Sequence, residues 1–208
     1  MQTTDAIFYV AVLIMSVVIH EVSHGYAAYL LGDNTAKASG RLTLNPLKHL
    51  DPLGSVIIPA ILVLTHAGFV FGWAKPVPYN ERNLNNQRWG SAIVASAGII
   101  ANLCVAIIFS ILIRISPSLG IHTLSFFYFA STVVLVNVVL AVFNLVPIPP
   151  LDGSKILFSF LPARLRHLQN YIERFGVFFL VIFVFFLWRF IGPVIYSLFH
   201  LLTGISVS

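Results

Sequence analysis

Two histidines and a glutamate stand together in the first apolar stretch of the chain. Residues 6–31 contain no Lys, Arg or Asp, and Glu21, between His20 and His24, is their only charged residue. Ionisable side chains are costly inside a bilayer, so three of them here indicate a functional site. On a helix, His-Glu-x-x-His places both imidazoles on one face, where they can hold one metal ion. The alternative is a buried polar cluster that joins helices.

A catalytic zinc ion takes three protein ligands and keeps one position for water, so a third ligand must lie elsewhere. Asp152 is the best candidate among the seven acidic residues, because it follows a long apolar stretch with a proline-broken end. Pro147 ends regular helix, and Gly153 permits an unusual backbone beside the carboxylate. Irregular backbone at membrane depth is tolerated where it lines a cavity. The alternative is a carboxylate that caps a helix beginning near Ser154.

The composition assigns the chain to the membrane proteins. Of its 208 residues 58% are hydrophobic and 9% charged, and the mean hydropathy is +0.92, far above that of a soluble domain. The net charge of +5 is modest and the basic residues lie in loops, which favours topology signals over nucleic-acid binding. The lone Cys104 excludes an internal disulfide and a cysteine-based metal site. The first residues, MQTTD, lack the basic region of a signal peptide, so we expect the first apolar stretch to be retained.

Long apolar stretches define the expected fold. A helix needs about 20 apolar residues to cross a hydrocarbon core of ~30 Å. Four stretches have that length: 6–31, 90–113, 124–147 and 175–202. We therefore predict an all-α polytopic membrane protein with about four membrane-spanning helices.

The stretches form one expected domain, residues 1–208, with a catalytic core over about 6–160. Residues 172–203 would form one C-terminal helix or a kinked helix pair, because Arg189 and Pro193 interrupt their apolar pattern.

A fifth apolar stretch, residues 53–72, is weaker because Pro59 lies in its interior. We predict a re-entrant segment that enters the membrane and leaves on the same side. Residues 68–80 combine β-prone residues between two glycines with alternating prolines, which predicts a short β-hairpin-like loop with an extended edge.

Three segments together resemble the site-2 protease family of intramembrane zinc metalloproteases. They are HEVSH at 20–24, NLVPIPPLDG at 144–153 and AGIIAN at 97–102. The last matches the family's Gly-Pro-x-x-Asn element, except that Ile99 replaces the proline. The stretches GRLTLNPLKHLDPLGS and GWAKPVPYN resemble the compact prokaryotic branch that has no PDZ or CBS domain. The resemblance covers residues 6 to about 160.

The resemblance implies one zinc ion per chain, held by His20, His24 and Asp152, with Glu21 as the catalytic carboxylate. Glu21 would take a proton from water and deliver it to the leaving amine.

Further polar residues have weaker assignments. Asn144 and Asn102 are supporting or oxyanion-stabilising candidates, with hydrogen bonding between helices as an equal alternative. For Asn137, hydrogen bonding between helices is favoured. His49 and His66 are interpreted as interfacial or structural.

The expected substrates are membrane-spanning helices. A peptide bond inside a helix is shielded, so the substrate must unwind, and an extended segment can pair with a strand edge near Gly68–Tyr79. The candidate substrate contacts are therefore Gly72, Trp73, Lys75 and Pro76. We expect the lipid bilayer as the environment and no nucleic-acid partner, and a homo-oligomer is compatible with the sequence.

The distribution of basic residues predicts the orientation. If 53–72 does not cross the membrane, Arg114 lies on one side and Arg189 is unassigned. The ten on the other side are Lys37, Arg41, Lys48, Lys75, Arg82, Arg88, Lys155, Arg164, Arg166 and Arg174. We therefore predict a multi-pass protein of a prokaryotic cell membrane with its active site towards the cytoplasmic side.

Two other functions compete with proteolysis. A metal-ion transporter or a non-hydrolytic metal-binding membrane protein would also place an ion between helices. However, no second His-rich stretch occurs, as duplicated halves would require. A catalytically inactive scaffold is disfavoured because both histidines, Glu21 and Asp152 are present.

Overall fold

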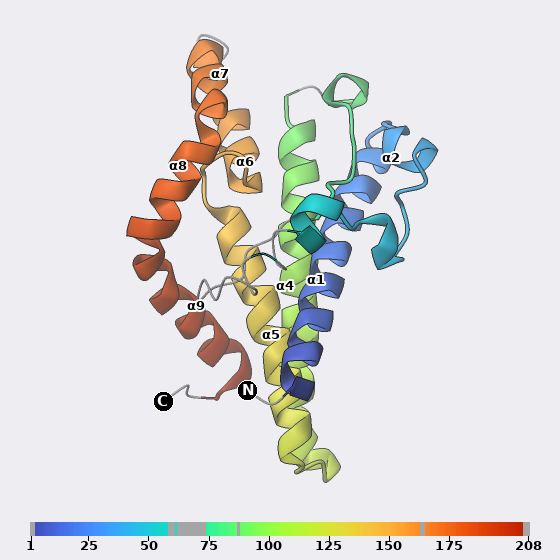
Figure 1. Cartoon of the computed structure of the whole chain (residues 1–208), viewed down its shortest axis with the longest axis vertical. Coiled ribbons are helices and arrows are strands. Elements are labelled where there is room, and N and C mark those ends of the chain that lie inside the picture. Colours follow the sequence, from blue (N-terminus) through green and yellow to red (C-terminus); the bar gives the residue numbers. More distant parts are fainter. Residues whose placement is uncertain (1–2, 58–60, 62–73, 87, 163–164, 206–208) are drawn as a thin grey trace.

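Three long helices running side by side form the body of the protein (Figure 1). The computed structural model describes residues 3–57, 61, 74–86, 88–162 and 165–205. α1 and α5 run in the same direction, and α4 runs in the opposite direction between them in the chain. The three are α1 (Thr3–Leu30), α4 (Gly90–Ile115) and α5 (Leu124–Leu145).

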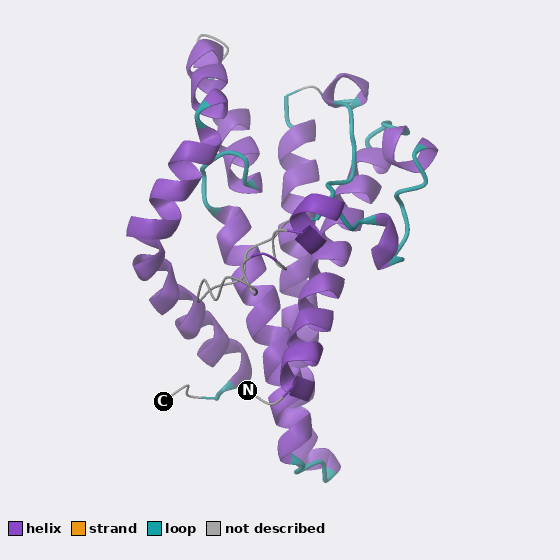
Figure 2. Ribbon diagram, viewed as in Figure 1, coloured by secondary structure: helices purple, strands orange, loops and turns teal. Residues whose placement is uncertain are grey.

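Shorter helical elements connect and extend this body. Within the described residues every regular element is helical and no strand occurs (Figure 2). After α1 come α2 (Thr35–Ala38), η1 (Pro46–Lys48), η2 (Pro52–Ile57) and η3 (Glu81–Asn83), and η4 (Ser116–Leu119) follows α4. After α5 come α6 (Asp152–Phe160), α7 (Arg166–Arg174), α8 (Gly176–Ile182), η6 (Phe183–Leu187) and α9 (Trp188–Thr203).

Three of the predicted spans are confirmed as helices long and apolar enough to cross a membrane. α5 ends at Leu145, earlier than the predicted 147, and Val146 is extended with ψ 128°. The reason is steric, because the ring of Pro147 disfavours helical backbone in the preceding residue. The stretch 175–202 is a helix pair bent by 72° between Gly176–Phe186 and Arg189–Thr203, so a fourth span exists only if the pair crosses as one unit.

Apolar side chains pack in the interior of this helical body, and other apolar side chains are exposed on its outside. One buried cluster joins α4, α5 and α9 through Ala106, Ile113, Ala130, Val134, Val138, Ile195 and Phe199. Large aliphatic side chains are nevertheless exposed along the long helices, such as Val10 at 51% and Ile111 at 51%. Helices of this length and hydropathy that expose large apolar side chains belong in lipid, so the chain is a membrane protein.

The predicted re-entrant segment and hairpin fall mostly outside the described residues. Of 53–72 only 53–57 and 61 are described, and they include the π-helical turn η2, so the re-entrant course stays a prediction. Of 68–80 the described part, 74–80, is a loop without a strand, so no hairpin is found there. Its prolines lack the N–H groups that a ladder needs.

Candidate active site

The two histidines of α1 and the first residue of α6 meet at one point. Nε2 of His20 lies 3.0 Å from Oδ2 of Asp152, and Nε2 of His24 lies 3.1 Å from the same oxygen. The possible ligand atoms of the three residues all lie within 4.8 Å of one another. All three side chains are buried. The sequence-predicted set therefore comes together in space.

The other ring nitrogens of both histidines face hydrogen-bond acceptors. Nδ1 of His20 lies 2.6 Å from Oδ1 of Asn102, and Nδ1 of His24 lies 2.7 Å from the carbonyl oxygen of Val94. Each neutral imidazole therefore donates from Nδ1 and presents the lone pair of Nε2. Two such lone pairs and the carboxylate oxygen of Asp152 need a cation between them. Two imidazoles and one carboxylate are a ligand set that fits zinc, and the acceptors behind the rings are the partners that zinc-binding histidines usually have.

Gly98 on α4 provides the space for the two imidazoles. A Cβ atom there would lie 2.6 Å from Cε1 of His20, 2.6 Å from Cε1 of His24 and 2.7 Å from Nε2 of His24. These distances are far inside van der Waals contact, so any side chain at this position would push both rings away.

We therefore expect Gly98→Ala to lower zinc affinity at least about 10-fold, the scale typical of a disturbed metal surrounding. Zinc affinity of the purified protein, from competition with a chelator, would show this. Gly192→Ala is the matched control, because a Cβ there would meet nothing within 4 Å. Unchanged affinity in Gly98→Ala would mean that the rings do not need this space.

Asp152 reaches the histidines from the first turn of α6. α6 begins at Asp152 itself with Leu151 as the N-cap, so Asp152 does not occupy the capping position of a helix that begins near Ser154. Burial alone would raise the pKa of Asp152, but the two histidines beside its carboxylate lower it well below its usual range. The carboxylate is therefore an anionic metal-ligand candidate.

Gly153 allows two helices to pack closely. A Cβ on Gly153 would overlap the carbonyl groups of Leu145 and Val146. The expected unusual backbone is not observed, because Gly153 is absent from the described glycines with positive φ. The small residue instead lets the start of α6 pack against the end of α5.

Glu21 faces a cavity that the metal-ligand candidates share. The cavity has a volume of about 170 Å³. Oε2 of Glu21 accepts a hydrogen bond of 2.8 Å from the backbone N–H of Val77, which fixes the orientation of the carboxylate. The lining residues are His20, Glu21, His24, Pro76, Val77, Tyr79, Asn144, Pro150, Asp152 and Lys155.

Lys155 connects two walls of this cavity. Its Nζ lies 3.9 Å from Oδ1 of Asp152, the oxygen turned away from the histidines, and 5.2 Å from the centre of the Tyr79 ring. Burial alone would lower the pKa of Lys155, but Tyr79 and Asp152 raise it, so the ammonium stays charged.

The loop of residues 74–86 that carries Val77 is anchored to the end of α1. Asp33, fully buried, accepts from the backbone N–H of Asn80 at 2.7 Å and from Nδ2 of Asn83 at 2.9 Å. Burial would raise the pKa of Asp33, but hydrogen bonds from Thr35, Asn80 and Asn83 lower it. The buried carboxylate therefore holds the loop beside the cavity.

A second anchor acts on the same loop through Arg41. Its guanidinium donates to the carbonyl oxygen of Lys75 at 2.7 Å and to that of Pro76 at 3.3 Å. The N–H of Lys75 donates to the carbonyl of His49 at 2.8 Å. His49 itself is buried and its Nε2 lies 2.8 Å from the carbonyl of Thr43, away from the metal-ligand candidates.

Of the remaining predicted site residues, some line the cavity and others do not. Asn144 lines the cavity, and its Nδ2 donates to the carbonyl of Leu140 at 2.9 Å. Asn102 is fully buried behind His20. Pro76 lines the cavity, whereas the side chain of Lys75 is exposed. The candidates Gly72 and Trp73, and also His66, lie outside the described residues.

Four cavity-lining residues and the role of Gly98 were not predicted from the sequence. Lys155 had a usable signal, because a residue three positions after Asp152 on a helix lies on the same face. Val77, Tyr79 and Pro150 had none, since their positions depend on contacts between distant segments.

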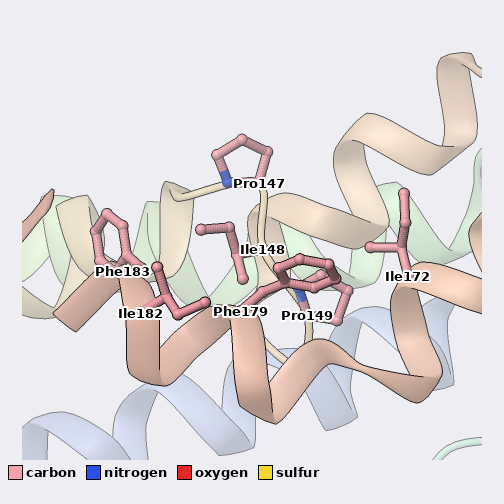
Figure 3. Close-up of a pocket in the computed structure, with 7 residues that line it drawn as sticks. All are labelled: Pro147, Ile148, Pro149, Ile172, Phe179, Ile182 and Phe183. Atoms are coloured by element: carbon pink, nitrogen blue, oxygen red, sulfur yellow. The ribbon is translucent and has the colours of Figure 1, made fainter. Parts of the chain in front are cut away.

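A second cavity, of about 160 Å³, lies between the proline-rich turn and the C-terminal helices (Figure 3). Pro147, Ile148 and Pro149 form one wall, opposite Ile172, Phe179, Ile182 and Phe183. Gly176, at the start of α8, approaches so closely that a Cβ would lie 2.7 Å from Cβ of Pro149. The C-terminal helices thus support the turn that carries Asp152.

A His-Glu-x-x-His helix with a carboxylate from a second element, set among helices long and apolar enough to cross a membrane, defines a metallopeptidase of the membrane. Residues 115–187 match peptidase family M50. YwhC of Bacillus subtilis (strain 168) is 42% identical over 183 residues, which are 85% of this chain and 80% of that protein. The chain therefore belongs to peptidase family M50, the site-2 protease family, and is a zinc metalloprotease.

Two more relatives are more distant. Rip2 of Mycolicibacterium smegmatis is 34% identical over 155 residues, which are 71% of this chain and 54% of that protein. Rip2 of Mycobacterium tuberculosis is 29% identical over 188 residues, 87% of this chain and 70% of that protein. All three relatives are named as "putative zinc metalloprotease". No solved structure matches the chain.

Proposed function

We propose that this protein is an intramembrane endopeptidase that hydrolyses peptide bonds within or near the transmembrane helices of other membrane proteins. The observation that carries the proposal is the position of Glu21 and the two histidines inside the span Ile7–Leu30. One zinc ion per chain would be held by His20 Nε2, His24 Nε2 and Asp152 Oδ2. Cleavage of membrane helices follows because the reacting groups lie among apolar helices.

Zinc at this site would lower the pKa of a bound water towards about 7 and polarise the scissile carbonyl. Glu21 supplies the proton transfers. The N–H of Val77 holds Oε2, so Oε1 would be the oxygen that takes a proton from water and delivers it to the leaving amine. Asn144 bonds Leu140 through Nδ2, and the second hydrogen of that amide can stabilise the oxyanion.

The substrate would enter the cavity as an extended segment, because helical backbone hides its carbonyl groups. Pro76 lies in the cavity wall and Lys75 beside it, which supports their assignment as substrate contacts, and we retain Gly72 and Trp73 as candidates. The proposed partners are transmembrane helices in a lipid bilayer, without nucleic acid, and self-association is compatible with this scheme.

Reconstitution with a single-span substrate that has Gly or Pro near its middle would test this function. We expect cleavage inside the substrate helix, loss of cleavage after chelation, and recovery with added zinc. Mass spectrometry of the products locates the cut. Zinc movement into the vesicles without any cleavage would instead support the transporter alternative.

For orientation, we propose that both ends of 53–72 lie on the cytoplasmic side. The N–H of Lys75 bonds the carbonyl of His49, which brings the two ends of the intervening segment together and favours a return to the same side. α1 and α5 also run in the same direction, as a site shared by their C-terminal ends requires (Figure 1). The excess of basic residues on that side favours the cytoplasm of a prokaryotic cell.

Single cysteines would test this topology in a Cys104→Ser background. We expect cysteines at Asn45 and Asn83, which flank the segment and are both exposed, to react with a membrane-impermeant reagent only after the membrane is permeabilised. A cysteine at Leu119, which is 66% exposed at the opposite end of α4, is the control and should react in intact cells. Reaction in intact cells at Asn83 but not at Asn45 would show that the segment crosses.

A further inference from the structure

A buried polar network joins α1, α4 and α5 behind His20. Asn102 and Asn137 are both fully buried, and Ser16 is 3% exposed. Nδ2 of Asn102 donates to Oδ1 of Asn137 at 2.8 Å and to the carbonyl of Ser16 at 3.3 Å. Nδ2 of Asn137 donates to Oγ of Ser16 at 2.9 Å and to the carbonyl of Val133 at 2.9 Å. Each helix therefore contributes a member.

Two backbone carbonyls fix the orientation of the side-chain amides of Asn137 and Asn102. The carbonyls of Val133 and Ser16 only accept, so they must face the NH₂ groups of Asn137 and Asn102. The oxygen of Asn137 then faces Asn102, and the oxygen of Asn102 faces Nδ1 of His20 at 2.6 Å. Turning the Asn102 amide over would place its oxygen against two other oxygens, with buried groups left unsatisfied.

We infer that Asn137 and Ser16, which hydrogen-bond each other and Asn102, are positioning residues that set the tautomer of His20 through Asn102. The oxygen of Asn102 demands a hydrogen on Nδ1, so Nε2 of the neutral ring is the atom with the lone pair. The opposite tautomer would direct the lone pair to Asn102 and remove a ligand from the site. The inference rests on the proposed zinc site, because the tautomer matters only if Nε2 binds a metal.

Asn137→Leu is the informative variant. Leucine is close to asparagine in size but has no oxygen for Asn102, whose NH₂ group then keeps the longer bond to the Ser16 carbonyl. We expect about a 10-fold loss of zinc affinity, the lower end of the effect of outer partners of metal ligands. Asn137→Asp retains an oxygen facing Asn102 and should bind zinc closer to wild type. Ser110→Ala is the matched control, because Ser110 is buried and its hydroxyl donates to the carbonyl of Ala106 in its own helix.

The tautomer itself is read by ¹⁵N NMR of histidine-labelled protein. An Asp152→Ala background without zinc is used, at a pH where the imidazole is neutral, so that neither metal nor carboxylate competes for Nε2. We expect one tautomer of His20, with hydrogen on Nδ1, and a mixture once Asn137→Leu is added. If Asn137→Leu fails to fold, Ser16→Ala removes only a hydroxyl and should give the same mixture at a lower level.

Two results would overturn the inference. One is an unchanged tautomer in folded Asn137→Leu or Ser16→Ala, even with weaker zinc binding, because Asn137 would then only join helices. The other is a shift to mostly the opposite tautomer with unchanged zinc affinity, because the tautomer of His20 would then not matter for metal binding. Absence of zinc binding by the wild-type protein would instead refute the proposed function, and the zinc-free NMR measurement would still decide whether the network sets the tautomer.

Discussion

Glu21→Gln should lower the rate of peptide hydrolysis at least about 100-fold while the protein still binds zinc, since positioned proton transfer typically contributes 10²–10⁴-fold. Glutamine has the shape of glutamate and keeps an oxygen that can accept from the N–H of Val77. It cannot take up a proton from water. The loop and the histidines should therefore stay in place while the chemistry stops.

The measurement compares zinc content and product formation for purified wild-type and Glu21→Gln protein in the same lipid. Glu173→Gln is the control, because Glu173 is an exposed carboxylate on α7 that bonds Gln169, away from the cavity. Wild-type hydrolysis by Glu21→Gln would eliminate Glu21 as the proton carrier. Loss of zinc would make Glu21 a ligand.

Local sequence rules predicted the part of the site that one helix contains. The spacing of His20, Glu21 and His24 fixes their shared face once residues 6–31 are helical, and α1 is helical throughout. The approach of Asp152 was predictable for a similar reason, since the proline-broken end of α5 allows a turn back towards α1. These features depend on backbone periodicity and on proline sterics, both of which are visible in the sequence.

Contacts between distant segments were not predictable in this way. The hydrogen bond from Val77 to Glu21 joins residues 56 positions apart, and the direction of Asn102 depends on carbonyls of two other helices. Gly98 was noticed as a motif residue, but its role as space for two imidazoles depends on how α1 packs on α4. Side-chain type gives the capacity for such contacts, and packing decides which ones form.

The bend in the C-terminal helices lies several residues before the proline that was expected to cause it. Pro193 was expected to interrupt 175–202, yet it lies inside α9, and the 72° bend falls between Phe186 and Arg189. Proline has no N–H for the carbonyl four residues earlier, which is that of Arg189. The bend therefore falls about one turn before the proline, next to the π-helical turn η6.

Asp152→Ala should lower zinc affinity at least about 10-fold and reduce hydrolysis in proportion, because it removes the proposed anionic ligand. The structure adds a second reason for a large effect. Nζ of Lys155 lies 3.9 Å from Oδ1 of Asp152, so without the carboxylate an uncompensated ammonium would remain beside the metal. Repulsion between Lys155 and zinc should then add to the lost bond.

The double variant Asp152→Ala/Lys155→Met separates these two contributions. If the ammonium repels zinc, the double variant should bind zinc more tightly than Asp152→Ala and still more weakly than the wild type. Asp51→Asn is the control among the other carboxylates, because its Oδ1 accepts from the N–H groups of Leu53 and Gly54, and asparagine keeps that oxygen. Wild-type zinc affinity in Asp152→Ala, with loss in Asp51→Asn, would move the third ligand to the loop after α1 and refute the site proposed here.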